Sequence, residues 1–139
     1  MKLPRAVFRY VEHELYHYDQ TLEDISELQR DVAESQMAAE FVSPLVQSGR
    51  ISDPTFRKAN RLILSSALAR MVKTAKAIER ALSRLPDGHQ ELYRLKYRQG
   101  CSPQEMCDKL HIELSTYYKW RREVVHMAAL EMGLVIVGD

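Results

Sequence analysis

Two long stretches of the chain place apolar side chains at alternating steps of three and four residues. In the first stretch these positions are Phe8, Val11, Leu15, Tyr18, Leu22, Ile25, Gln29 and Val32, with one polar residue among them. In the second they are Leu64, Leu68, Met71, Ala75, Ile78, Leu82 and Leu85. Such spacing keeps one apolar stripe along an α-helix over several heptads. It predicts an all-α protein with two long helices, over residues 5–40 and 54–85.

Proline and capping signals mark the ends of these two helices. Pro4 suits a first helical turn, and Asp53 before Pro54 is typical of an N-cap followed by proline at the first helical position. Residues 41–54 contain two prolines and a glycine and are expected to connect the helices. The apolar residues Val42, Leu45, Val46 and Ile51 are expected to keep this connection packed.

The charges of the two stretches are opposite in sign. Residues 1–52 have a net charge of −4 (5 Lys and Arg, 9 Asp and Glu), and residues 53–84 have +6 (8 and 2). We therefore expect an antiparallel helical hairpin, with acidic residues of the first helix beside basic residues of the second. The acids are Glu23, Asp24, Glu27, Asp31 and Glu34, and the bases are Arg61, Arg70, Lys73 and Lys76. Packing of both helices into a globular bundle is the alternative.

Three shorter helices are expected after Leu85. The first lies between Pro86 and Gly100. The second begins with Ser102, Pro103 and Glu105, which is the pattern of a capping box. The turn at 111–114 then leads to a last helix that is expected to be capped by Ser115 and to end near Gly133.

The last two of these helices have the pattern of a helix-turn-helix, in which the second helix enters the major groove of DNA. We expect the buried side to comprise Met106, Leu110, Ile112, Tyr117 and Val124, with Trp120 at its edge. The DNA-binding residues are expected to be Leu114, Ser115, Thr116, Tyr118, Lys119, Arg121 and Arg122. Hydroxyl groups and cations bind phosphates, apolar atoms contact thymine methyl groups, and arginine reads guanine.

The segment from Leu85 to Ala128 resembles region 4 of sigma-70-type factors. It has a Leu-Pro start, a helix that ends near a glycine, an acidic and apolar first helix, and a Ser-Thr-led recognition helix. With the long helices before it, the chain resembles the ArpU/RinA-type phage late-transcription regulators. This resemblance implies a phage or prophage activator that binds DNA near promoters and acts with host RNA polymerase, with Ser115 to about Ala128 as recognition helix. The family's usual turn glycine is replaced by His111, a residue type that tolerates positive φ.

Other kinds of site have weak support in the sequence. Cys101, Cys107 and His111 lack the paired short spacing of a structural zinc site, and Cys107 is better explained as packing. His13 and His17 lie four apart beside acidic residues and are expected on a solvated surface. No nucleophile–base pattern or phosphate-binding glycine loop is present, so we expect neither an enzyme nor a cofactor.

The sequence thus predicts a helical hairpin over 1–85 and a DNA-binding domain over 86–139, in a transcriptional regulator of the bacterial cytoplasm. The expected partners are double-stranded DNA, RNA polymerase and a second copy of the chain, with a dimer favoured and no membrane involved. Two alternatives stay open. A small-terminase-like packaging protein also joins a helix-turn-helix to a coiled coil, and a helical interaction module would bind no DNA.

Overall fold

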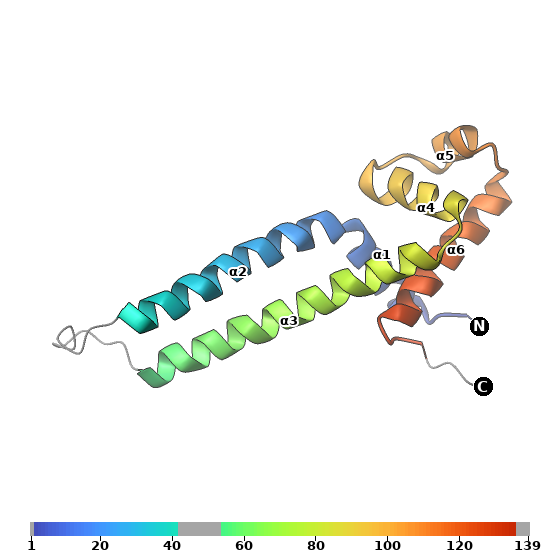
Figure 1. Ribbon diagram of the computed structural model, residues 1–139. Coiled ribbons are helices and arrows are strands. Elements are labelled where there is room, and N and C mark those ends of the chain that lie inside the picture. The colour runs from blue at the N-terminus through green and yellow to red at the C-terminus, as the bar shows by residue number, and fades with distance from the viewer. Residues whose placement is uncertain (1, 42–53, 136–139) are drawn as a thin grey trace. The chain divides into compact units, whose positions relative to one another are not determined.

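The computed structural model describes residues 2–41 and 54–135, and every regular element in these ranges is a helix (Figure 1). The elements are α1 (Arg5–Tyr16), α2 (Tyr18–Phe41), α3 (Pro54–Arg84), α4 (Asp87–Tyr93), the π-helical turn η2 (Arg94–Arg98), α5 (Pro103–Leu110) and α6 (Leu114–Glu131). The expected all-α class is therefore confirmed. The expected packing of Val42, Leu45, Val46 and Ile51 and the expected N-cap at Asp53 lie outside the described residues. None of the described helices is long and apolar enough to cross a membrane.

The first long helix is interrupted at His17. This residue has φ −100° and ψ 13°, and its backbone N–H and its Nδ1 both bond to the carbonyl oxygen of His13, at 3.1 and 2.7 Å. The two imidazole rings stack with centroids 4.0 Å apart. The expectation of one continuous helix over 5–40 is wrong. A heptad pattern shows which residues form the apolar face of a helix, but it does not show a local side-chain contact that ends the helix.

The chain divides into two compact units. We call Met1–Asp19 together with Lys73–Asp139 the core unit, and Gln20–Val72 the hairpin unit. This division differs from the expected boundary after residue 85. The difference arises because α1 and the last part of α3 bury their apolar side chains against the C-terminal helices.

The core unit has one apolar core to which α1, α3, α4, α5 and α6 all contribute. Its largest fully buried side chains are Val11, Leu15, Ile78, Leu92, Met106, Tyr117, Val124 and Val125. Burial of each aliphatic side chain of this size contributes about 1.5–3 kcal/mol relative to an exposed position. The C-terminal helix α6 is therefore held by the N-terminal helix as well as by the helices next to it in sequence.

The apolar side chains of the hairpin unit are less buried than those of the core unit. In this unit α2 and the first part of α3 run in opposite directions, which is consistent with the expected hairpin (Figure 1). Leu64 and Leu68 are only half-buried, while Leu62 and Ile63 are 64% and 65% exposed. The expected charge pairing is not formed in the described part of this unit, where neither Arg61 nor Arg70 has a carboxylate partner.

Candidate nucleic-acid interface

Helix α5 begins at the capping box that the sequence predicts. The Ser102 side chain accepts a hydrogen bond from the Glu105 backbone N–H at 3.2 Å, and the Glu105 carboxylate accepts one from the Ser102 N–H at 3.4 Å. Pro103 occupies the first helical position. Two N–H groups that would lack helical partners are thereby satisfied, and the start of α5 is fixed.

The tight turn between α5 and α6 depends on His111. This residue ends α5 in the left-handed conformation, with φ 55° and ψ 48°, and it is the only described non-glycine residue with positive φ. The expectation that histidine takes the place of the turn glycine is confirmed. The next backbone N–H, of Ile112, bonds to the Cys107 carbonyl at 3.1 Å. A turn this short leaves α6 close against α5.

Helix α6 starts two residues earlier than a cap at Ser115 would allow. Its first residue is Leu114, its N-cap position is held by Glu113 without a side-chain hydrogen bond, and the Tyr117 N–H already bonds to the Glu113 carbonyl at 3.0 Å. The expected capping role of Ser115 is therefore wrong. Ser115 instead lies in the first helical turn with its side chain exposed, because Glu113, with ψ 159°, is the last extended residue before the helix.

The buried side of the helix-turn-helix matches the expectation. Met106, Tyr117 and Val124 are at most 1% exposed, and the half-buried Leu110 and Ile112 pack against the same core. The Trp120 ring does cover the edge of this core. It stacks on the buried His89 ring at 4.7 Å and approaches the backbone of Gly88 so closely that a Cβ there would lie 2.8 Å from the ring.

Most of the expected DNA-binding residues are exposed on α6. Leu114 is 50% exposed and Tyr118 41% exposed, and Ser115, Lys119 and Arg122 are exposed as well. Thr116 is half-buried. Ser115, Lys119 and Arg122 lie at steps of four and three, so they form one stripe along the helix, which we call the outward stripe.

The structure places Arg121 away from this stripe. Its Nε and Nη2 donate to the two carboxylate oxygens of Glu12 on α1, at 2.9 and 2.7 Å, and its guanidinium lies 5.0 Å from the centre of the Phe8 ring. Arg121 was expected to bind DNA, but it follows the buried Tyr117 by one helical turn and therefore faces α1. Its positive charge is paired with Glu12 inside the core unit.

Glu12 is the centre of a half-buried network. The Tyr97 hydroxyl donates to the same carboxylate at 2.7 Å, beside the two bonds from Arg121. Burial by itself raises the pKa of Glu12, but the hydrogen bonds from Arg121 and Tyr97 and the positive charges of Arg121 and Lys96 more than offset it, so the pKa lies below its usual value of 4.5. The carboxylate is therefore ionised at neutral pH, and it holds α6 against α1.

One residue of the outward stripe was missed from sequence. His126 follows Arg122 by four residues, so it continues the stripe, and it lines a groove along α6 to which Lys119 and Arg122 also contribute. The four-residue spacing could have identified His126 as part of the stripe. It was overlooked because the expected interface was confined to the first part of the helix.

The cations of the stripe differ from most arginines of the core unit. Arg80 and Arg84 pair with Glu131, Arg94 pairs with Glu91, and Arg98 pairs with Asp19. Within the described ranges, neither Lys119 nor Arg122 has a carboxylate partner. Their charge is available to an external anion.

Metal ligands are not assembled in the described part of the chain, which contains no cluster of three or more His, Cys, Asp or Glu that could hold an ion. Cys101 and Cys107 are half-buried thiols that pack against the core. Comparison of the chain with models of protein families, with curated proteins and with solved structures finds no match.

Proposed function

We propose that the protein is a sequence-specific DNA-binding regulator of transcription, in which α5 and α6 form the helix-turn-helix and α6 lies in the major groove. The observation that carries this proposal is that α6 has one buried side and one exposed, positively charged side. Its inner side is buried to 1% or less at Tyr117 and Val124, while Lys119 and Arg122 on its outer side are exposed without carboxylate partners among the described residues. This division leaves α6 free to contact DNA without loss of core packing.

The chemistry of the outer side fits both parts of DNA recognition. Arg122 can read a guanine through two hydrogen bonds, and Leu114 can contact a thymine methyl group. Ser115 and Lys119 supply a hydroxyl group and a positive charge for phosphates. We assign base reading to Arg122 and phosphate binding to Lys119.

The biological setting comes from the resemblance to ArpU/RinA-type regulators. On that basis we propose a phage or prophage activator that acts with the host RNA polymerase in the bacterial cytoplasm. We further propose association with a second copy, for which the exposed Leu62 and Ile63 of the hairpin unit supply adjacent apolar side chains.

The test is selection of binding sites from a random duplex library, followed by anisotropy titrations of the selected site over a range of salt concentrations. Arg122→Ala should weaken binding to the selected site by about 1–3 kcal/mol and relax the preference at one base pair. Lys119→Ala should weaken all duplexes alike and lower the slope of log K against log salt by about 1.

Arg94→Ala is the matched control, because Arg94 is an exposed arginine paired to Glu91 on the same helix turn. This variant should bind as the parent does. Failure of the wild-type protein to select any sequence, or unchanged binding by the Arg122→Ala and Lys119→Ala double variant, would refute the proposal.

A further inference from the structure

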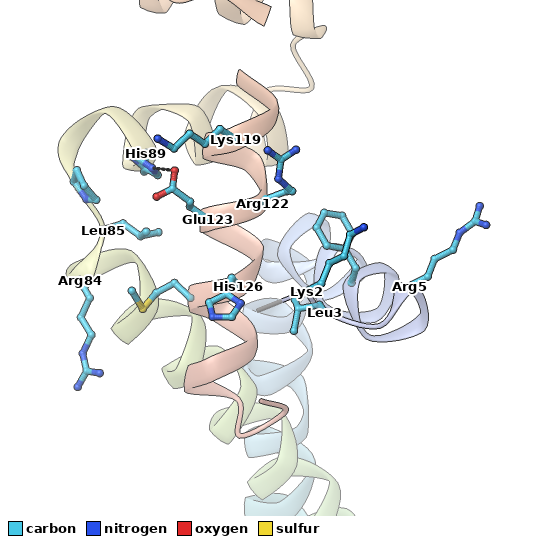
Figure 2. A pocket seen from close by; sticks show the side chains of 13 residues that line it. Lys2, Leu3, Arg5, Arg84, Leu85, His89, Lys119, Arg122, Glu123 and His126 are labelled. Atoms are coloured by element: carbon cyan, nitrogen blue, oxygen red, sulfur yellow. Dashed lines mark ion pairs between the residues drawn. The ribbon is translucent and has the colours of Figure 1, made fainter. Parts of the chain in front are cut away.

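A groove of about 810 Å³ lies along α6 in the core unit (Figure 2). Its cations come from three parts of the chain. Lys119 and Arg122 project from α6, Lys2 and Arg5 come from the N-terminal segment and the start of α1, and Arg84 comes from the end of α3. Of these five, only Arg84 has a carboxylate partner in the described ranges, Glu131.

The walls of this groove are largely apolar. Leu3 and Phe8 line it from the N-terminal side, Leu85 lines it from the residue after α3, and Met127 lines it from α6. Positive charges set on low-dielectric walls act on an anion more strongly than the same charges spread over a flat aqueous surface. The groove is therefore suited to an anionic ligand.

One acidic and one imidazole side chain of the groove lie against each other. Glu123 is the only carboxylate among the described lining residues, and it points toward His89, with 3.5 Å between its Oε1 and the histidine Nε2 (Figure 2). The His89 side chain is 9% exposed, and neither ring nitrogen has a hydrogen-bond partner among the described atoms. The one negative charge of the groove is thus directed at His89, and the cations Lys2, Arg5, Lys119 and Arg122 outnumber it.

We infer that this groove holds the phosphate backbone of the DNA duplex that α6 reads, with Lys2 and Arg5 binding phosphates outside the base-contacting region. The inference rests on the proposed function, because Lys119 and Arg122 belong both to the outward stripe and to the groove. A duplex held by these two side chains presents a sugar–phosphate strand to the groove beside them. The N-terminal segment then supplies charge to the same strand.

Duplex DNA accounts for this arrangement better than an acidic protein segment does. An acidic segment would occupy Lys119 and Arg122 and thereby compete with DNA for the helix. With DNA as the ligand, the N-terminal cations and those of α6 act together. Their combination also explains how a C-terminal segment with a net charge of −1 over residues 85–139 can bind a polyanion.

The inference is tested with Lys2→Ala, Arg5→Ala and the double variant of the full chain, in salt titrations on a selected site and on an unrelated duplex. Each substitution should lower the salt slope by about 0.9 and weaken both duplexes equally, since phosphate contacts carry no sequence information. In an ethylation-interference experiment, ethylation of some phosphates should weaken binding of the wild-type protein. Ethylation of the same phosphates should not weaken binding of the double variant.

The control is Lys76→Ala, which removes an equal charge from an exposed position of the core unit that does not line the groove. It should leave the salt slope unchanged. Lys2 and Arg5 are exposed, so their variants should melt with the parent. A salt slope of the double variant equal to that of the wild type would overturn the inference and favour an acidic protein segment as occupant of the groove. In that case the effect of Arg122→Ala on base preference would still support the proposed function.

Discussion

The Arg121 guanidinium on α6 makes two hydrogen bonds to the Glu12 carboxylate on α1, although 109 residues separate the two side chains. The contact is partly buried, with 30% of the Arg121 side chain and 13% of the Glu12 side chain exposed. The first helix of the chain is thereby fixed to the proposed recognition helix. A change in Glu12 should therefore affect the stability of the unit that contains α6.

The first prediction concerns the strength of this pair. Glu12→Ala and Arg121→Ala should each lower the free energy of unfolding by about 2–4 kcal/mol, because each leaves a partly buried charge without its partner. Denaturant unfolding of both variants and of the double variant gives the coupling energy, which we expect to be about 1–3 kcal/mol. Additive losses would show that the two bonds contribute no mutual stabilisation.

The second prediction concerns acid pH. The hydrogen bonds from Arg121 and Tyr97 keep the pKa of Glu12 below 4.5, so the unfolded chain binds a proton at this residue more readily than the folded protein. The resulting stabilisation is fully present above about pH 4.5 and is lost as the pH falls through the folded pKa. Melting of the wild type and Glu12→Gln from pH 7 to pH 3 should show a difference that narrows below pH 4.5. A constant difference would contradict this linkage.

The third prediction concerns Gly88. A Cβ at this position would lie 2.8 and 2.9 Å from two ring atoms of Trp120, and the ring cannot withdraw freely because it stacks on His89. Gly88→Ala should therefore destabilise the protein by about 1–3 kcal/mol, as overpacking usually does. Gly100→Ala is an informative comparison, since no atom lies near its added Cβ and the cost there comes from the positive φ of 70°. Trp120 fluorescence should change only in Gly88→Ala.

The start of α5 and the turn between α5 and α6 were predictable because local chemistry defines them. Ser102 and Glu105 form a capping box within four residues, and His111 is a residue type that tolerates the left-handed conformation the turn requires. Helical periodicity likewise identified Tyr117 and Val124 as buried. These features depend on neighbours in sequence, and the sequence shows those neighbours directly.

The role of Arg121 was not predictable in the same way. Its partner Glu12 lies on a helix that sequence assigned to a separate domain, and no local pattern links the two residues. The groove has the same origin, because Lys2 and Arg5 line it together with Lys119 and Arg122 only through the packing of α1 in the core unit. Charge counts along the sequence therefore underestimate the positive charge beside α6.

The fourth prediction concerns self-association. Leu62 and Ile63 are adjacent on α3 and almost two-thirds exposed, and a second copy would remove this apolar surface from water. Light scattering should report a dimer or larger assembly for the wild type, and Leu62→Glu with Ile63→Glu should shift it to monomer. Because neither side chain is buried, the double variant should keep its helical content. A wild-type monomer at high micromolar concentration, with and without DNA, would reject self-association.

The last prediction concerns Glu123, the one carboxylate among the described residues of the groove. Its negative charge opposes a phosphate strand held by Lys2, Arg5 and Lys119, so Glu123→Gln should tighten DNA binding. The side chain is 48% exposed, and solvent screening limits the gain to about twofold to threefold at moderate salt. The Glu123 side chain is half exposed and makes no hydrogen bond to His89, so the stability should change little. Asp108→Asn removes an equal charge from an exposed position of α5 outside the groove and serves as the control. Weaker binding by Glu123→Gln would mean that this carboxylate positions His89 or Lys119 for DNA, rather than opposing the phosphate strand.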